Sequence, residues 1–198
     1  ALKAFNQALV IEPGNRIARE GRLLTLSQLG SPDIALAEAG RYSDLDRGIV
    51  QRLYEDEAAL AIRRSENVYH ENPATVIPAI DTAIAMIEAN LQRYPGSERS
   101  RFDYVRALAN RNRHRAAIAV YETLIKENRA LPGYSHQSAG LAYLAEQLPE
   151  QAKTAFMAAL TADPNDFSAS VGFFYALCDL TDFSRAKAHI DALAARPL

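Results

Sequence analysis

The sequence predicts an all-α protein in which antiparallel helix pairs stack into a right-handed superhelix. Alanine is abundant and the 198 residues include only nine glycines and nine prolines, a composition that favours helices. The stretch "QAKTAFMAALTADPND" places Ala152, Phe156, Ala159 and Pro164 four, three and five residues apart, and the opening "ALKAFNQALVIEPGN" repeats this spacing. Residues three and four apart share one helix face, so the alanines let a neighbouring helix approach closely while the phenylalanine fills the space between.

Residues 133–166 carry the complete pattern. Ala139, Gly140 and Tyr143 fall on a predicted first helix, and Pro164 ends the second helix because proline cannot continue it. The combination A-G-x-x-Y, A-x-x-x-F-x-x-A and proline is typical of the tetratricopeptide repeat, a helix pair of about 34 residues. Several such copies in phase predict a solenoid, which grips partners with extended surfaces.

Further copies follow along the chain, so we expect a single repeat region over residues 1–198 with about eleven helices. Its predicted parts, in order, are a partial copy at 1–15, a copy at about 16–42, an irregular stretch at 43–97, and copies at 98–132, 133–166 and 167–198. The partial copy begins in a second helix, whereas the ends of a solenoid need polar caps. We therefore expect this chain to be a segment of a longer protein.

The irregular stretch differs from the other copies. Apolar residues at helical spacing between positions 45 and 60 predict one long amphipathic first helix. Ser43, with Asp46 three residues later, resembles a capping box at its start. Pro73 and Pro78 are expected to break the chain that follows.

The sequence offers little support for catalysis. It contains none of the common phosphate-binding, hydrolase, metalloprotease or dinucleotide-binding motifs. The single cysteine, Cys178, excludes an internal disulfide framework, and its apolar surroundings favour packing over a role as nucleophile. The four histidines are not spaced to bind a metal from one helix face. We therefore expect no enzyme, no cofactor and no metal site.

Charge and hydropathy exclude further classes. The net charge of −2 gives no argument for nucleic acid, and no apolar run approaches the roughly 18 residues of a membrane-spanning helix. The carboxylates of Glu55, Asp56 and Glu57 point in different directions on a helix, which favours a solvated face over a catalytic pair. Six arginines form either a patch for an anionic partner or a surface paired with nearby acids: Arg99, Arg101, Arg106, Arg111, Arg113 and Arg115.

The first helices of successive copies are expected to line a groove in which repeats of this kind bind their partners. The groove-facing positions predicted from the repeat are Arg99, Phe102, Arg106 and Asn110 in one copy, Tyr134, Gln137 and Leu141 in the next, and Val171, Tyr175 and Asp179 in the last. Aromatic and hydrogen-bonding side chains suit a peptide or a sugar chain. The alternative for each residue is that it faces solvent or packs on its neighbour.

Several stretches resemble the tetratricopeptide region of the outer-membrane poly-N-acetylglucosamine export proteins. They are "ALKAFNQALVIEPGNRIAREGRLLTLSQLGSPDIALAEA", "RFDYVRALANRNRHRAAIAVYETL", "AGLAYLAEQLPEQAKTAF" and "DPNDFSASVGFFYALCDLTDFSRAKAHIDALAA". The resemblance implies a segment of an outer-membrane protein on the periplasmic side of the bacterial outer membrane, before a secretion pore for a biofilm polysaccharide. It also implies a partner, the periplasmic deacetylase of that polymer. The family offers no catalytic residues to carry over to this chain.

We therefore predict a periplasmic scaffold that docks the deacetylase, guides the poly-N-acetylglucosamine chain to the pore, or does both, without binding nucleic acid or spanning the membrane itself. Partly deacetylated polymer is cationic, and four acids near the last turns could attract it: Asp163, Asp166, Asp179 and Asp182. One alternative is a generic peptide-binding adaptor. Another is a regulatory repeat region of an enzyme whose catalytic domain lies outside this sequence.

Overall fold

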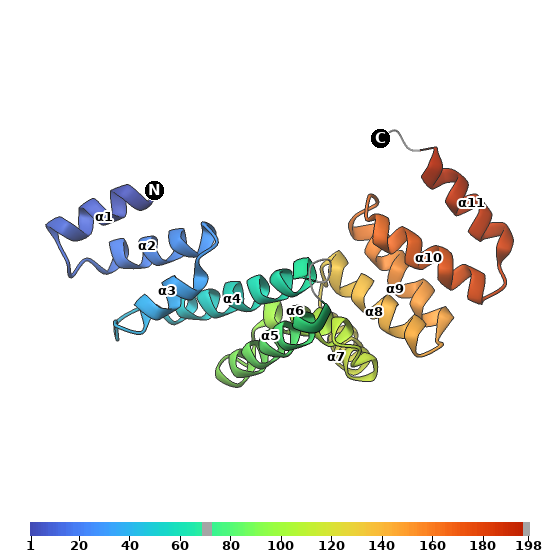
Figure 1. The fold of residues 1–198 in the computed structure, drawn as a ribbon, viewed down its shortest axis with the longest axis horizontal. Coiled ribbons are helices and arrows are strands. Elements are labelled where there is room, and N and C mark those ends of the chain that lie inside the picture. Colours follow the sequence, from blue (N-terminus) through green and yellow to red (C-terminus); the bar gives the residue numbers. More distant parts are fainter. Residues whose placement is uncertain (69–72, 196–198) are drawn as a thin grey trace. The chain divides into compact units, whose positions relative to one another are not determined.

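The computed structural model describes residues 1–68 and 73–195, and the regular elements in these residues are all helices (Figure 1). In chain order they are α1 (Leu2–Ile11), α2 (Arg16–Gln28), α3 (Pro32–Ala39), α4 (Arg47–Val68), α5 (Pro73–Arg93), α6 (Glu98–Asn110), α7 (His114–Lys126), α8 (Gly133–Ala145), α9 (Pro149–Ala162), α10 (Phe167–Asp179) and α11 (Phe183–Ala194). The prediction of an all-α fold with about eleven helices is confirmed for the described residues.

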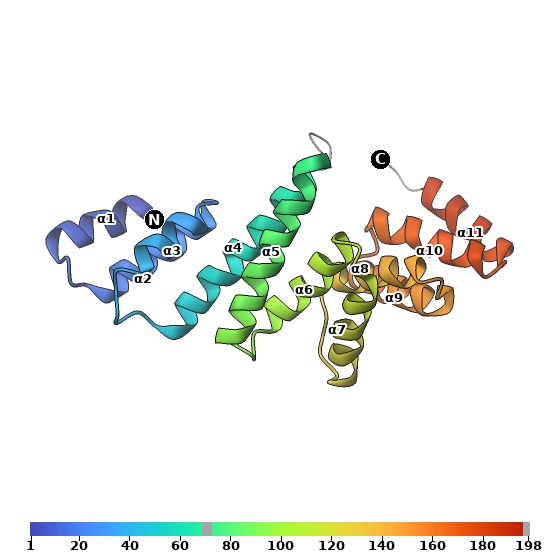
Figure 2. The same cartoon turned by 60° about the horizontal axis from the view of Figure 1, so that its bottom comes forward.

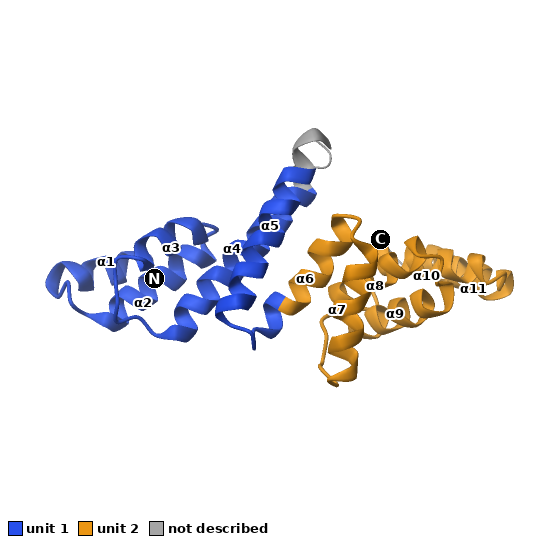
Figure 3. Ribbon diagram, turned by 90° about the horizontal axis from the view of Figure 1, so that it is seen from below, with its two compact units in different colours: residues 1–100 blue, residues 101–198 orange. Residues whose placement is uncertain are grey.

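The helices group into two compact units, residues 1–100 and residues 101–198 (Figure 3). In the first unit α2 packs on α1, α3 and α4, and α4 packs on α5. Figure 2 shows α4 and α5, the two longest helices, lying side by side. In the second unit α8 packs on α7 and α9, and α10 packs on α8, α9 and α11. Consecutive helices from α1 to α5 and from α7 to α11 thus pack on one another within their units, while a single array over the whole chain stays a prediction.

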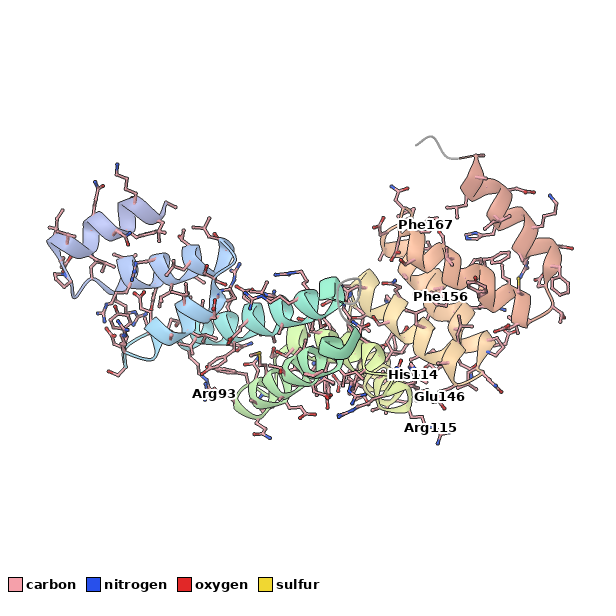
Figure 4. The ribbon with its side chains drawn as sticks, viewed as in Figure 1. Arg93, His114, Arg115, Glu146, Phe156 and Phe167 are labelled. Carbon is pink, nitrogen blue, oxygen red and sulfur yellow. The ribbon has the colours of Figure 1, made fainter. Side chains whose placement is uncertain are left out.

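The core of the second unit is built around Phe156 on α9, which is fully buried (Figure 4). An ideal Cβ atom placed on Gly140 of α8 would lie 2.7 Å from its ring, and one placed on Gly172 of α10 would lie 2.3 Å from it. We call the space beside these two glycines the notch. Ala152 and Ala159, on the same face of α9, are also fully buried. The predicted combination of small residues with one large side chain is therefore what brings three helices together.

The first unit contains the same contact between a phenylalanine ring and a glycine, between α1 and α2. An ideal Cβ on Gly21 of α2 would lie 2.4 Å from the ring of Phe5 on α1, and the two residues have the sequence spacing of Phe156 and Gly172. Phe5, however, is only half-buried. The repeated sequence therefore produces the same contact in both units, with tighter enclosure in the second.

The long helix predicted in the irregular stretch is confirmed, because α4 runs from Arg47 to Val68. Its predicted capping box is wrong. Asp46, not Ser43, caps the helix, because Asp46 Oδ1 accepts hydrogen bonds from the backbone N–H groups of Gly48 at 2.8 Å and Ile49 at 3.3 Å. The helix consequently begins later than the sequence pattern indicated.

The prediction that Pro78 breaks the chain is also wrong, because Pro78 lies inside α5. Pro73 occupies the first position of this helix, where a missing N–H group costs nothing. Pro78 lies early in the helix and removes one backbone hydrogen bond. The buried apolar face that follows, which includes Ile84 and Ile87, outweighs that loss.

Candidate functional site

The predicted groove residues of the second unit lie on its first helices, α6, α8 and α10. We call them the first-helix face, which consists of Phe102, Arg106, Asn110, Tyr134, Gln137, Leu141, Val171, Tyr175 and Asp179. Tyr175 is 57% exposed and Leu141 is 45% exposed, and α8 packs directly on α10. An aromatic and an aliphatic side chain are therefore presented to solvent from neighbouring first helices.

Tyr134 is held in place by two neighbouring side chains of α6. Its hydroxyl donates a hydrogen bond to Asp103 Oδ1 at 2.8 Å, and Asp103 is buried. The guanidinium carbon of Arg106 lies 5.6 Å from the centre of the Tyr134 ring, within the range of a cation–π contact. Phe102, by contrast, packs against the hydrophobic core. The ring and the guanidinium are thus held in place before any partner arrives, whereas Phe102 has a packing role.

Arg99 lies in the first unit and already has a partner there. Its Nη1 atom lies 2.5 Å from Asp56 Oδ1, and the other oxygen of Asp56 accepts a hydrogen bond from Ser27 Oγ at 2.6 Å. Glu55 Oε1 accepts a hydrogen bond from Ser97 Oγ at 2.6 Å. The solvated face predicted for these acids is therefore wrong for Glu55 and Asp56, which connect α4 to neighbouring segments. A binding role for Arg99 stays a prediction.

The arginine stretch is extensively paired with acids. Arg101 donates to both oxygens of Glu127, at 2.7 and 2.8 Å, and this hydrogen bonding lowers the pKa of Glu127 to about 2. Arg115 Nε lies 2.8 Å from Glu146 Oε2, and Figure 4 shows the two side chains together at the ends of α7 and α8. These contacts support the paired surface over an open patch for an anionic partner.

The four acids near the last turns do not form one cluster. Asp166 caps α10 by accepting the Ala169 N–H at 2.9 Å, and Asp182 caps α11 by accepting the Arg185 N–H at 3.2 Å. Asp163 Oδ1 accepts the N–H of Asn165 in the turn before α10. The acids before α10 and those at its end are separated by the helix, about 20 Å at 1.5 Å per residue. Asp179 is exposed, and the capping and turn contacts above involve only the other three acids.

A pocket that the sequence analysis missed lies between α7, α8 and α9. It has a volume of about 370 Å³ and is open to solvent. Tyr121, Glu122 and Ile125 line it from α7, and His136 and Tyr143 line it from α8. We call this the α7–α9 pocket. Mostly apolar walls with a few polar groups are what a binding pocket for a side chain or small ligand requires.

The polar groups of the α7–α9 pocket are mutually bonded. The Tyr121 hydroxyl lies 2.8 Å from His136 Nδ1, and the Tyr143 hydroxyl donates to Glu122 Oε1 at 3.2 Å. Burial raises the pKa of Tyr121 to about 12 and lowers the pKa of His136, while burial and then the charge of Glu122 raise the pKa of Tyr143. At neutral pH both phenols therefore stay protonated, and the lowered pKa keeps His136 neutral.

The cysteine and the possible metal ligands do not form a catalytic or metal site within the described residues. Cys178 is a half-buried free thiol on α10. Over residues 1–68 and 73–195, no group of three histidine, cysteine or acidic side chains is placed to hold a metal ion. Within the same residues, no helix is both long enough and apolar enough to cross a membrane.

The repeat pattern of the helix pair α8–α9 is matched by a family model. The model described as a tetratricopeptide repeat covers residues 134–166. The chain therefore contains a tetratricopeptide repeat at residues 134–166. Proteins built from this repeat are scaffolds for protein–protein interaction and are typically not enzymes, so protein partners are expected at the exposed faces of these helices.

Solved tetratricopeptide-repeat structures resemble this one over most of its length. MamA (residues 41 to the end) from Desulfovibrio magneticus RS-1 has a TM-score of 0.58 and 16% identity, covering 89% of this chain and 93% of its own. TTC0263, a thermophilic TPR protein of Thermus thermophilus, has a TM-score of 0.56 and 17% identity, covering 89% of each chain. The first TPR domain of human RPAP3 has a TM-score of 0.50 and 17% identity, covering 66% of this chain and 98% of its own. At these identities the likeness shows the fold alone.

A comparison with curated proteins gave no significant match. The binding roles of the first-helix face and of the α7–α9 pocket therefore rest on their own geometry. The pocket residues escaped the sequence analysis because they lie away from the predicted groove. The signal that could have found them is the spacing of His136 and Tyr143, which lie seven residues apart on α8 and thus on one helix face.

Proposed function

We propose that this tetratricopeptide-repeat protein is a periplasmic scaffold of a poly-N-acetylglucosamine exporter. In this role it docks the deacetylase of the polymer and guides the chain toward an outer-membrane pore during biofilm formation. The sequence resemblance to the repeat region of such exporters supports this assignment, because it extends in a consistent order from "ALKAFNQALVIEPGN" to the last helix pair. The repeat fold supports a role as a scaffold, but it does not favour the deacetylase over other protein partners.

The proposal that this chain docks the deacetylase rests on one observation: large side chains are exposed at equivalent positions of neighbouring first helices. Leu141 on α8 and Tyr175 on α10 hold the same place in consecutive copies, and both are substantially exposed. Aromatic and aliphatic side chains of this kind contribute most when a partner covers them completely. The fixed pair of Arg106 and Tyr134 adds a cation and a hydrogen-bonded phenol to the same face.

Guidance of the polymer would rest on a smaller feature of the same face. Asp179 follows Tyr175 by one helical turn, so a carboxylate and an aromatic ring lie on one side of α10. A free amine of the partly deacetylated polymer would pair with the carboxylate while a sugar ring packs on the phenol. Three of the four acids first considered have turn or capping roles, so we place the polymer contact at Asp179.

Docking is tested by retention of the purified deacetylase on the immobilised chain. Tyr175→Ala and Leu141→Ser should each weaken retention about tenfold or more, the effect of a central contact residue. The matched control is Met157→Ser, because Met157 is similarly exposed, at 53%, but lies on the second helix α9. If the unaltered chain fails to retain the deacetylase while holding unrelated peptides, the generic adaptor replaces the proposal.

Polymer binding is tested separately by calorimetry with soluble glucosamine oligomers. Partly deacetylated oligomers should bind more tightly than fully acetylated ones, and Asp179→Asn should remove the difference. Asp163→Asn is the control, because its carboxylate serves the turn before α10. Equal binding of both oligomers, or an unchanged preference in Asp179→Asn, would contradict polymer guidance while leaving deacetylase docking in place.

A further inference from the structure

The α7–α9 pocket arises where one copy departs from the packing of the next. Tyr121 and Phe156 hold equivalent places, each four residues after a fully buried alanine of its second helix, Ala117 and Ala152. The Phe156 ring lies in the notch beside Gly172. The residue equivalent to Gly172 in the preceding copy is Ser138, which is buried and has a side chain where glycine has none, and its hydroxyl donates to the backbone carbonyl of Tyr134. Tyr121 accordingly packs edge-on against His136, with ring centres 5.7 Å apart.

The next copy also shows what kind of group belongs in this place. Counted from the starts of copies 133–166 and 167–198, Ala155 and His189 are equivalent, as are His136 and Ser170. The ring of His189 lies edge-on to Phe173, with centres 5.0 Å apart, and its Nε2 is 3.1 Å from the Ser170 carbonyl oxygen. The α7–α9 pocket has only the methyl group of Ala155 where its neighbour has an imidazole, and it has the imidazole of His136 where its neighbour has Ser170. Beside these two side chains a space of about 370 Å³ is open to solvent, which is room for a ring supplied by another molecule.

The charge at the rim of the pocket adds a second requirement. Glu122 is exposed, and the Tyr143 hydroxyl fixes the position of its carboxylate. Lys126, one turn further along α7, also lines the pocket, but it lies in the last turn of that helix, where the partial negative charge of the helix end favours its cation. Glu122 is thus the fixed rim charge that a partner would complement. A basic group beside the ring would meet it.

We infer that the α7–α9 pocket binds an aromatic side chain of a protein partner, flanked in that partner by lysine or arginine. The ring enters between Tyr121, Ile125 and Ala155, and the basic group pairs with Glu122 at the rim. Burying an aromatic side chain in a preformed pocket of about 370 Å³ is the arrangement that gives an interface its central contact.

This site is separate from the first-helix face. Two residues along a helix turn the direction of the side chain by about 200°. His136 therefore points away from the direction of Tyr134, and Tyr143 away from that of Leu141. A partner in the pocket leaves the first-helix face open, so the inference does not depend on deacetylase docking or on the polymer.

The test uses three labelled hexapeptides and the full chain in fluorescence anisotropy. The first peptide is Gly-Ser-Arg-Phe-Ser-Gly, the second replaces its phenylalanine with alanine, and the third replaces its arginine with glutamate. The first should bind at least about tenfold more tightly than either of the others, which corresponds to one well-formed anchor. Equal binding of the three peptides would overturn the inference, and so would tighter binding of an N-acetylglucosamine oligomer at the same site.

Three variants locate the binding. Ala155→His introduces into the pocket the histidine that stands at the equivalent position of the next copy, and it should abolish binding of the first peptide. The control is Ala119→His, at an exposed position of α7, which should leave binding unchanged. Ile125→Ser changes a wall residue that is already 44% exposed, so it tests the pocket even if Ala155→His fails to fold. Glu122→Gln should remove the preference for arginine over glutamate. Full binding in Ile125→Ser together with an unchanged charge preference in Glu122→Gln would refute the site.

Discussion

Gly172→Ala is a direct test of how the helices of the second unit are held together. The added methyl carbon would lie 2.3 Å from Phe156 Cζ and 2.4 Å from its Cε1, far inside an ordinary contact. The ring cannot move away easily, because it is fully buried and the space beside Gly140 is also too tight for a further carbon. The substitution therefore forces α9 and α10 apart or displaces the ring from its rotamer.

The magnitude follows from two opposing effects. Overpacking a closed core costs about 1–3 kcal/mol, and enclosure of Phe156 by both glycines places this site near the upper end. Alanine in place of glycine within a helix returns about 1 kcal/mol. Gly172→Ala should therefore lower the free energy of unfolding by about 2 kcal/mol, less than the roughly 3–5 kcal/mol expected for Phe156→Ala.

Urea denaturation followed by circular dichroism measures the loss, and hydrogen exchange with mass spectrometry assigns it to peptides of α9 and α10. Gly21→Ala is the matched control, because its new methyl group would meet Phe5 at 2.4 Å, but Phe5 is half-buried and can rotate toward solvent. We expect a change within about 1 kcal/mol there. An unchanged or higher stability in Gly172→Ala, or an equal loss in both variants, would refute the idea that a closed notch clamps these helices.

Three further outcomes are expected. Asp166→Ala should lower the free energy of unfolding by about 1 kcal/mol through loss of the cap on α10, measured by urea denaturation. Burial lowers the pKa of His136 in the folded chain, so this histidine takes up its proton at a higher pH in the unfolded chain than in the folded one. The free energy of unfolding should therefore fall as the pH drops below about 6.5. His136→Gln should show a shallower decline between about pH 7.5 and 5.5 in thermal melts. Asp56→Asn should cost at most about 1 kcal/mol, because the paired Arg99 is partly exposed, and the loss should shrink at high salt.

The repeat pattern predicted the architecture because packing of this kind depends on side-chain size at fixed helical spacing. Small Ala152 and Ala159 with large Phe156 permit few arrangements other than close contact with neighbouring helices. Pro78 shows where such reasoning fails. A proline early in a helix removes one hydrogen bond, and whether the helix survives depends on how much apolar surface the following turns bury.

The candidate sites were less predictable, because they depend on contacts between residues far apart in sequence. Asp56 was expected on a solvated face, yet it meets Arg99 and Ser27, which belong to other helices. The four acids near the last turns looked like one cluster in the sequence, but α10 separates Asp163 from Asp179. Charge patterns within one helix therefore said little about which charges remain available to a partner.

Within a repeat protein, the positions that match the pattern and those that depart from it carry different information. Phe156 and Gly172 match, and their contact closes the space between consecutive helix pairs. His136 and Ala155 depart from Ser170 and His189 of the following copy, and both line the α7–α9 pocket. Because the rest of that helix pair keeps the pattern, the departures can open a binding space without disturbing the fold. Comparing equivalent positions between copies of one chain thus indicates where a scaffold has room for its partner.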